Sequence, residues 1–441
     1  MTDPVAASLQ SAAPWWHPRV GRSLVIHGGR PLVGTYPVSG AKNAVLPLMV
    51  SAVLTPHLVT LHNVPASLDV AVLSALLQRL GADMRWSTAS GGLSVTICAD
   101  RIQPGNIEPD LVARMRASVL LLGTLLARSG EARLPMPGGD AIGLRGIDFH
   151  IAGLRAMGAQ VELAGGMIHA RAPTGLKGAD IRLPMPSVGA TENLLLAAVR
   201  ARGTSVIRNA AREPEIADLA RCLIAMGARI SGLDTHTLII NGDAPLMGAV
   251  HTVMPDRIEM GTLACAAAVT DGEILLRHTQ PDLLGAAGPV LAAAGVALHP
   301  VDGGVVARRS PAGLTGTDFV TQPYPGFATD LQAPMMALLT VATGASAITE
   351  TIFEQRFRHV DELRKMGADI TVRGRTAWVR GVPTLRGGAV SCTDVRAAAA
   401  LVIAALGAVG ETTIDGLDHL DRGYDQIAEK LTACGAAMIR A

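Results

Sequence analysis

A short motif recurs six times along the chain, and it constrains the fold more than any other feature. The copies are LLQRLGADMRW, GLRAMGAQVEL, CLIAMGARISG, VLAAAGVALHP, ELRKMGADITV and KLTACGAAMIR. In each copy a helix-like segment ends in a Gly-Ala or Gly-Val step, and a strand-like alternation follows. The glycines are Gly81, Gly158, Gly227, Gly295, Gly367 and Gly435, at intervals of 77, 69, 68, 72 and 68 residues. We therefore predict six repeats of one unit, each with its glycine in the left-handed conformation that often follows a helix end.

Each copy also carries a helix-like segment that is apolar on nearly all sides. These segments are 41–54, 115–127, 190–201, 258–270, 330–343 and 395–408. A helix without a polar face belongs inside a domain, so we expect helices at the centre and sheets outside them. Three copies per domain place the boundary near residue 254. The prediction is an α/β fold of two inside-out domains, built from six βαβ-type repeats.

Composition narrows the class of protein. A chain of 441 residues is too long for one ordinary core, and two domains are expected. A formal net charge of +1 gives no long-range electrostatic attraction for polyanions, so neither nucleic acid nor a membrane surface is expected as a partner. The five cysteines are scattered and lack CxxC spacing, which indicates no disulfide framework, no zinc site and a reducing cytoplasm. The N-terminus lacks a signal-peptide pattern and is expected to be a tail or a short docking arm.

Polar residues at the starts of the apolar helices suggest an anion site. They are Lys42, Asn43, Arg116, Thr191, Asn193, Arg257, Asp330 and Arg396. Taken singly, each is best explained as a helix cap. Helix N-termini attract anions, however, and the basic members oppose the helix dipole unless an anion or a carboxylate offsets them. Several such ends converging between two domains would form a phosphate-binding cleft.

The loops before the surface helices hold a second polar group, which comprises Asp140, Arg145, Arg356 and Arg422. For any single arginine, a surface pair with a nearby acid such as Asp148, Glu354 or Asp421 is the simpler explanation. Their recurrence at equivalent places in the repeat favours a shared cleft.

Nine motifs in order along the chain resemble the family of UDP-N-acetylglucosamine enolpyruvyl transferases. They are SGAKNAVLPL, PGGDAIGLR, PSVGATEN, NAAREPEI, PDRIE, FATDLQAP, FEQRFRHVDELRKMGA, DVRAAAALV and LDRGY, from about residue 23 to the C-terminus. The resemblance implies two inside-out domains with the first inserted near the chain start. It implies a domain at 42–254 and a second domain formed by 1–41 plus 255–441.

The resemblance also implies the chemistry. The family transfers the enolpyruvyl group of phosphoenolpyruvate to the sugar 3-hydroxyl of UDP-N-acetylglucosamine, with release of phosphate through a tetrahedral intermediate. This is the first committed step of peptidoglycan synthesis, and it uses no metal and no organic cofactor. Phosphoenolpyruvate would lie near Lys42, Arg145 and Arg422, with added positive charge from Arg116, Arg356 and Arg396. Asp330 matches the family's proposed base and Asn43 a hydrogen-bonding partner of the acceptor.

The nucleotide half of the acceptor would contact a further set of positions carried over by motif. Arg145, Asp148 and Phe149 would meet the uridine, and Ser187, Val188 and Gly189 would hold the diphosphate at a helix start. Glu213 and Ile352 complete the set. Gly146 stands where proline is usual and Met185 where some relatives have lysine. A related enzyme of secondary metabolism acting on another uridine nucleotide, or a non-catalytic nucleotide-binding relative, therefore stays an alternative.

Asp140 occupies the position at which most family members have cysteine, on the loop that supplies the acid for the methylene carbon. A carboxyl group can serve as that acid if burial or neighbouring anions raise its pKa. The structural alternative is a residue that only shapes the turn. Because a carboxylate is a poorer nucleophile than a thiolate, the sequence predicts resistance to the epoxide drug fosfomycin, which alkylates the cysteine of other members.

Overall fold

The chain forms two compact units, each with its own hydrophobic core. The structure is a computed structural model that describes residues 4–17, 21–89, 92–104 and 107–441. Unit 1 takes the described parts of 1–18, 40–140 and 145–254, and unit 2 takes those of 19–39, 141–144 and 255–441. The chain thus passes from unit 2 to unit 1 after Ser39 and returns after Met254.

The elements of unit 1 follow one another in chain order. They are α1 (Pro4–Ala12), α2 (Lys42–Ser51), η1 (Ala52–Leu54), β3 (Val59–His62), α3 (Leu68–Arg79), β4 (Asp83–Ala89), β5 (Gly92–Cys98), α4 (Pro109–Arg114), η2 (Arg116–Val119), α5 (Leu120–Ser129), β6 (Glu131–Pro135), α6 (Asp148–Ala156), β7 (Gln160–Ala164), β8 (Met167–Arg171), β9 (Asp180–Arg182), α7 (Val188–Ala198), β10 (Thr204–Arg208), α8 (Pro214–Ala225), β11 (Arg229–Ser231), β12 (Thr237–Asn241) and β13 (Ala249–Thr252).

Unit 2 begins with two strands from the N-terminal part of the chain and continues after residue 254. Its elements are β1 (Ser23–His27), β2 (Val33–Pro37), α9 (Arg257–Val269), β14 (Glu273–Arg277), η3 (Pro281–Leu284), α10 (Ala287–Ala293), β15 (Val296–Val301), β16 (Gly304–Arg309), β17 (Phe319–Val320), η4 (Thr329–Leu331), α11 (Gln332–Leu339), β18 (Ala345–Thr349), α12 (His359–Lys365), β19 (Asp369–Arg373), β20 (Thr376–Arg380), β21 (Ala389–Ser391), α13 (Val395–Gly407), β22 (Glu411–Asp415), α14 (Asp418–Gly423), α15 (Ile427–Ala433) and β23 (Ala437–Arg440).

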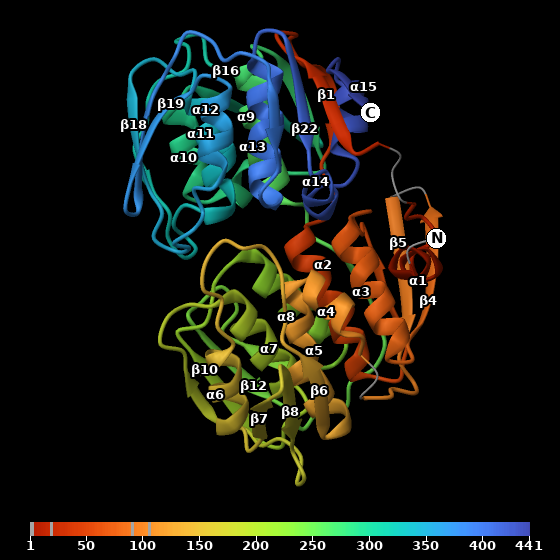
Figure 1. Ribbon diagram of the computed structural model, residues 1–441. Helices are drawn as coiled ribbons and strands as arrows, with labels where there is room; N and C mark the ends of the chain where they lie inside the picture. The colour runs from red at the N-terminus through yellow and green to blue at the C-terminus, as the bar shows by residue number, and fades with distance from the viewer. Residues whose placement is uncertain (1–3, 18–20, 90–91, 105–106) are drawn as a thin grey trace. The chain divides into compact units, whose positions relative to one another are not determined.

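The predicted inside-out arrangement is confirmed in each unit. The apolar helices α9, α11 and α13 pack against one another at the centre of unit 2, with strands outside them (Figure 1). In unit 1, α5 lies between α2 and α7 in the same way. All thirteen residues of α9 are buried, which explains why this helix has no polar face.

The six repeat glycines all adopt the left-handed conformation that the sequence predicts. Their φ angles lie between +89° and +104°, a range that only glycine adopts without strain. The strands that follow them are β4, β7, β11, β15, β19 and β23, and each lies at an edge of its sheet. Each glycine therefore turns the chain from a helix into the edge strand of its own repeat.

Strand pairing shows how the repeats are shared between the two units. Strand β2 precedes α2 in the chain but pairs in parallel with β14 of unit 2, whereas β13 precedes α9 but pairs in parallel with β3 of unit 1. Strand β1 lies between β22 and β23 and completes the last sheet. The N-terminal strands β1 and β2 consequently belong to unit 2.

Residues 4–17 depart from the predicted division, which assigned all of 1–41 to the second domain. Helix α1 contacts α3 of unit 1. The Trp86 Nε1–H donates to the Ala12 carbonyl over 2.9 Å, and the Trp15 and Trp86 rings meet edge to face at 5.2 Å. The aromatic contact supplies apolar burial that the sequence pattern of the repeats could not reveal, because the arm lies outside those repeats.

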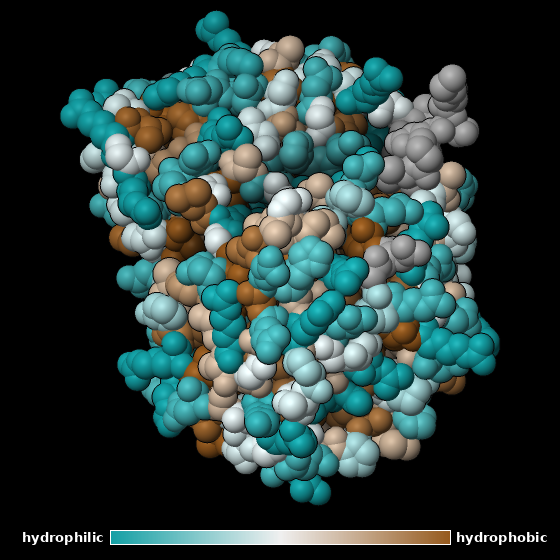
Figure 2. Space-filling model, turned by 60° about the horizontal axis from the view of Figure 1, so that its bottom comes forward, coloured by the Kyte–Doolittle hydropathy of each residue, from teal (hydrophilic) through white to brown (hydrophobic). Residues whose placement is uncertain are grey.

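Apolar residues are concentrated in the two cores. On the face drawn in Figure 2, hydrophilic residues are interspersed with smaller hydrophobic groups. Within the described part of the chain, no helix combines the length and the apolar character needed to cross a membrane.

Candidate active site

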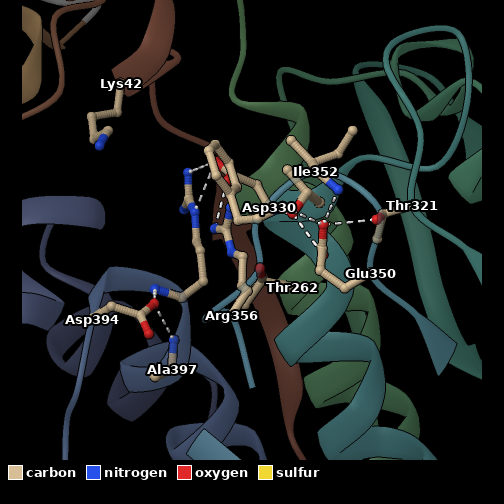
Figure 3. Close-up of polar contacts among 12 residues, drawn as sticks. Lys42, Thr262, Thr321, Asp330, Glu350, Ile352, Arg356, Asp394 and Ala397 are labelled. Atoms are coloured by element: carbon tan, nitrogen blue, oxygen red, sulfur yellow. Dashed lines mark hydrogen bonds and ion pairs between the residues drawn. The ribbon is translucent and has the colours of Figure 1, made fainter. Parts of the chain in front are cut away.

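In unit 2, three predicted site residues form one ion-pair cluster around Asp330. The Arg356 Nη2 donates to Asp330 Oδ1 over 2.7 Å, while Arg396 donates to Oδ2 from Nε over 3.1 Å and from Nη2 over 2.8 Å. Figure 3 shows Asp330 facing Arg356. Both arginine side chains are at most 5% exposed, whereas the Asp330 side chain is 23% exposed. The cluster therefore presents a carboxylate at its accessible end and buried cations behind it.

Local sequence explains why these groups lie at helix starts. Asp330 lies in η4, which leads directly into α11, and Ala328 before it provides no side-chain cap. Asp394 caps α13 by accepting from the backbone N–H groups of Arg396 and Ala397 (Figure 3). A carboxylate cap offsets the unfavourable interaction between a cation and the helix dipole, so Arg396 is tolerated in the first turn of α13.

Glu350 is hydrogen-bonded to the turn that carries Asp330, and it was not predicted as a site residue. Its Oε2 accepts from the Thr329 hydroxyl over 2.8 Å, and its Oε1 accepts from the Thr321 hydroxyl over 2.9 Å (Figure 3). The same Oε1 accepts from the backbone N–H of Ile352 over 2.8 Å. Glu350 thus connects the η4 turn that carries Asp330 to the turn that carries Ile352. A Glu before a loop gave no signal in the sequence, because the two hydroxyl groups that it binds, on Thr329 and Thr321, are 21 and 29 residues away.

Burial and charge act in opposite directions on the groups of this cluster. Burial opposes the charge on Arg396, but Asp330 and Tyr424 outweigh it, and the pKa of the guanidinium lies well above its ordinary value. The Arg396 guanidinium also lies over the Tyr424 ring at 5.4 Å. Burial lowers the pKa of His359, behind Arg356, to about 4, although Asp394 opposes that shift.

The segment around Arg422 is helical, whereas the sequence analysis placed it in a loop. Arg422 lies in the last turn of α14 and is half-buried. Asp421, one of the acids considered as surface partners, accepts from Arg440 Nη1 over 3.2 Å and also binds Arg440 Nη2. Arg356 donates to Asp330.

In unit 1, Lys42 and Asn43 open α2, a helix without a side-chain cap. The Lys42 ammonium lies 3.2 Å from Asp69 Oδ2, in the first turn of α3, and the Asp69 side chain is 3% exposed. This carboxylate offsets the cation at the helix start. Asp69 was not predicted as a site residue, although it lies in the NVPASLD loop of the repeat.

The glycines of the PGG loop are required by close backbone contacts. A Cβ on Gly138 would lie 1.7 Å from the Ala113 carbonyl oxygen, and Gly139 has a φ of +117°. A Cβ on Gly139 would also meet Arg116 Cβ at 3.1 Å and Arg145 Nη1 at 3.4 Å. The loop thereby brings the half-buried Asp140 into the neighbourhood of two arginines. Burial and Arg145 lower the pKa of Arg116 to about 10.

The four residues after Asp140 group with unit 2 instead of unit 1. The Leu144 N–H donates to Glu354 Oε1 over 2.6 Å, and the Gln355 N–H donates to the Ile142 carbonyl over 3.1 Å. The Leu144 hydrogen bond lowers the pKa of Glu354. The predicted 42–254 domain is wrong for this segment, because chain order gives no sign of these contacts.

Five of the predicted nucleotide-binding residues lie at two helix starts in unit 1. Asp148 and Phe149 form the first turn of α6, and Gly146 before them accepts from Arg116 Nη2 over 2.6 Å. A Cβ on Gly146 would lie 2.4 Å from Asp148 Oδ1, so glycine gives the carboxylate room. Ser187 caps α7, whose first residues are Val188 and Gly189. Glu213 precedes Pro214, the first residue of α8.

The fold and these helix starts define the enolpyruvyl transferase architecture, and the chain belongs to the EPSP synthase (3-phosphoshikimate 1-carboxyvinyltransferase) family, whose pattern matches residues 26–431. Two relatives named UDP-N-acetylglucosamine 1-carboxyvinyltransferase are particularly similar. The protein of Acidiphilium cryptum is 54% identical over 416 residues, which cover 94% of this chain and 98% of the relative. That of Rhodospirillum centenum is 51% identical over 424 residues, covering 95% and 98%.

Solved structures show the same architecture. The enolpyruvyl transferase NikO from Streptomyces tendae superposes with a TM-score of 0.85 at 26% identity, covering 96% of this chain and 99% of NikO. EPSP synthase from Acinetobacter baumannii gives a TM-score of 0.72 at 19% identity, covering 95% and 100%. At 19% identity, the similarity to EPSP synthase shows the fold alone.

Proposed function

We propose that the protein is an enzyme that transfers the enolpyruvyl group of phosphoenolpyruvate to the 3-hydroxyl of UDP-N-acetylglucosamine and releases phosphate. The observation that carries the proposal is the Asp330 carboxylate, held by the buried Arg356 and Arg396 at the start of α11, in a chain more than half identical to relatives of that name. Binding of a nucleotide alone would not require such a cluster. The reaction would be the first committed step of peptidoglycan synthesis, in the cytoplasm.

In this proposal, addition comes first. Asp330 accepts the proton of the sugar 3-hydroxyl as the oxygen bonds to the central carbon of phosphoenolpyruvate, while Asp140 gives a proton to the methylene carbon. Both Asp330 oxygens already accept from arginines, so the carboxylate must exchange part of these contacts or use a remaining lone pair. Its 23% exposure leaves it open on one side. The product of this step is a tetrahedral intermediate.

Elimination then restores the double bond. The bond from the central carbon to the phosphate oxygen breaks, phosphate leaves with the electron pair, and the methyl group returns a proton to the Asp140 carboxylate. Lys42, Arg145 and Arg422 are assigned to the phosphate and carboxylate of phosphoenolpyruvate, with Arg116, Arg356 and Arg396 adding positive charge. Asn43 is assigned to the acceptor sugar.

The nucleotide is assigned to unit 1, with uridine near Arg145, Asp148 and Phe149 and diphosphate at Ser187, Val188 and Gly189. The first N–H groups of α7 have no acceptor inside the helix and suit a diphosphate. Glu213 and Ile352 keep their assignment as acceptor-binding residues. A different uridine nucleotide is not favoured as acceptor, because the relatives named for UDP-N-acetylglucosamine share twice the identity of NikO.

Phosphate release tests the proposal. The full-length protein is incubated with phosphoenolpyruvate and, in separate reactions, UDP-N-acetylglucosamine, UDP-glucose, UDP and UMP. Release only with UDP-N-acetylglucosamine supports it. Turnover with another uridine nucleotide alone would assign a different acceptor, and nucleotide binding without any turnover would indicate a non-catalytic relative.

A further inference from the structure

The orientation of one buried amide in unit 1 is fixed by backbone groups. Asn193, in α7, accepts from the Gly123 N–H at Oδ1 over 2.8 Å and donates from Nδ2 to the Val119 carbonyl over 3.3 Å. An N–H can only donate and a carbonyl can only accept, so these two partners leave no choice of amide orientation. A Cβ on Gly123 would lie 2.3 Å from Asn193 Oδ1. Glycine at position 123 therefore makes room for this amide.

The fixed amide determines which nitrogen of His150 carries the proton. Asn193 Nδ2 has a second hydrogen, and it lies 2.9 Å from His150 Nδ1. That ring nitrogen must accept, so a neutral imidazole carries its proton on Nε2. Burial, with a smaller effect of Arg116, lowers the pKa of His150 to about 3. The side chain is consequently a neutral donor at physiological pH, and its donor atom is Nε2.

The Nε2 edge of His150 lies beside the first turn of α7. A Cβ on Gly189 would be 3.5 Å from His150 Cε1 and 3.7 Å from Nε2. His150 is 5% exposed, and within the described residues its side chain makes one hydrogen bond, the contact of Nδ1 with Asn193. The N–H donor of a buried side chain thus lies beside a helix start whose own first N–H groups also have no intrahelical acceptor.

We propose that His150 is a further binding residue for the nucleotide diphosphate, donating from Nε2, and that Asn193 is a positioning residue that fixes its tautomer. The inference rests on the proposed function, which places a diphosphate at Ser187, Val188 and Gly189. A neutral imidazole adds a directed hydrogen bond without adding a cation near Arg116. It favours a ligand with phosphate at this helix start over the bare nucleoside.

The alternative is a histidine that only fills the space between α6 and α7. Both versions predict loss of stability when His150 is replaced, so stability does not separate them. They differ in ligand dependence, because a space-filling histidine contributes equally whether or not the ligand carries phosphate.

Calorimetric binding of UDP and of uridine to the full-length protein separates the two. With His150→Phe, which keeps ring size but lacks the N–H, UDP affinity should fall about 10- to 100-fold, as expected for a lost hydrogen bond to a charged group. Uridine affinity should not change. The surface variant His236→Phe controls for loss of a histidine and should bind both ligands as the wild type does. Equal losses for UDP and uridine, or no loss for either, would refute the assignment.

Nitrogen-15 spectra of the wild type with labelled histidine provide a test that needs no variant. The His150 signals should show a protonated Nε2 and an unprotonated Nδ1, and UDP should shift the Nε2–H resonance. Asn193→Leu should give a mixture of the Nδ1–H and Nε2–H tautomers of His150 and weaken UDP binding, while leaving uridine binding unchanged. A protonated Nδ1 in the wild type would overturn the inference. Phosphate release by the wild type is measured in parallel. If the wild type releases phosphate and His150→Phe binds UDP normally, this inference alone is refuted. If UDP binding depends on His150 but the wild type releases no phosphate, only the proposed function is refuted.

Discussion

Acidification should destabilise unit 1 through His150. The folded state holds this imidazole neutral, with a pKa of about 3, whereas an exposed histidine in the unfolded chain titrates near 6.5. Between these values the unfolded chain binds more protons, so stability rises with pH in that window and falls as the pH drops from about 6.5 towards 3. Above about pH 7 both states are neutral and the effect vanishes.

The two pKa values give the size of the effect. At pH 5, protonation of this imidazole in the unfolded chain shifts the equilibrium towards unfolding by a factor of about 30, which corresponds to about 2 kcal/mol. The loss approaches roughly 1.4 kcal/mol for each further pH unit. His150→Gln removes the titrating group, so the stability of this variant relative to the wild type should improve by about 2 kcal/mol between pH 8 and pH 5.

Tryptophan fluorescence during urea unfolding measures this difference. Trp15, Trp16 and Trp86 are in unit 1, and a Trp378→Phe background removes the one tryptophan of unit 2. His236→Gln, on the surface of unit 1, is the control for losing one histidine. If the free-energy difference between His150→Gln and the wild type is the same at pH 8 and pH 5, the neutral, buried state inferred for His150 is wrong.

Three further outcomes follow from the structure. Asp140→Cys should become sensitive to fosfomycin, while the wild type should resist it; time-dependent covalent labelling of wild-type Asp140, read by mass spectrometry, would contradict this. Asp330→Asn should lower phosphate release at least about 100-fold and cost unit 2 roughly 3 kcal/mol, because two buried guanidinium groups lose their shared carboxylate; unchanged turnover would remove Asp330 from the mechanism. His359, with a pKa of about 4 in unit 2, should make that unit lose about 2 kcal/mol between pH 8 and pH 5; unfolding followed through Trp378 should show this loss in the wild type and not in His359→Gln.

Features set by local chain chemistry could be predicted from the sequence. A glycine at a helix end and an apolar helix each depend on neighbouring residues, so the six turns and the six buried helices were found by repetition alone. The predicted segment 258–270 corresponds to α9 at 257–269, and 395–408 corresponds to α13 at 395–407. The inside-out layering followed, because a helix apolar on all sides must be enclosed.

Features set by contacts distant in the chain could not be predicted. Lys42 finds Asp69 in a different helix, and Arg396 binds Asp330 from 66 residues away. The arm at 4–17 belongs to unit 1, where Trp15 packs against Trp86, and the segment at 141–144 belongs to unit 2, where Leu144 binds Glu354. Chain order indicates neither placement. Side-chain pairing of this kind leaves no periodic signal in one sequence.

The cations at the buried helix starts are offset in different ways, and the difference bears on where an anion will bind. Asp69 faces Lys42, and Asp394 with Asp330 offsets Arg396. Arg116 instead donates to the Gly146 carbonyl, and its pKa falls to about 10 because burial and Arg145 both oppose its charge. An anion beside Arg116 would oppose both causes of the lowered pKa, since it would replace the hydration lost on burial and offset the repulsion from Arg145. A lowered pKa at a cation and a raised affinity for an anion are two expressions of the same free energy. By this reasoning, we expect Arg116 to gain more from a bound phosphate or carboxylate than Lys42, whose ammonium already faces Asp69.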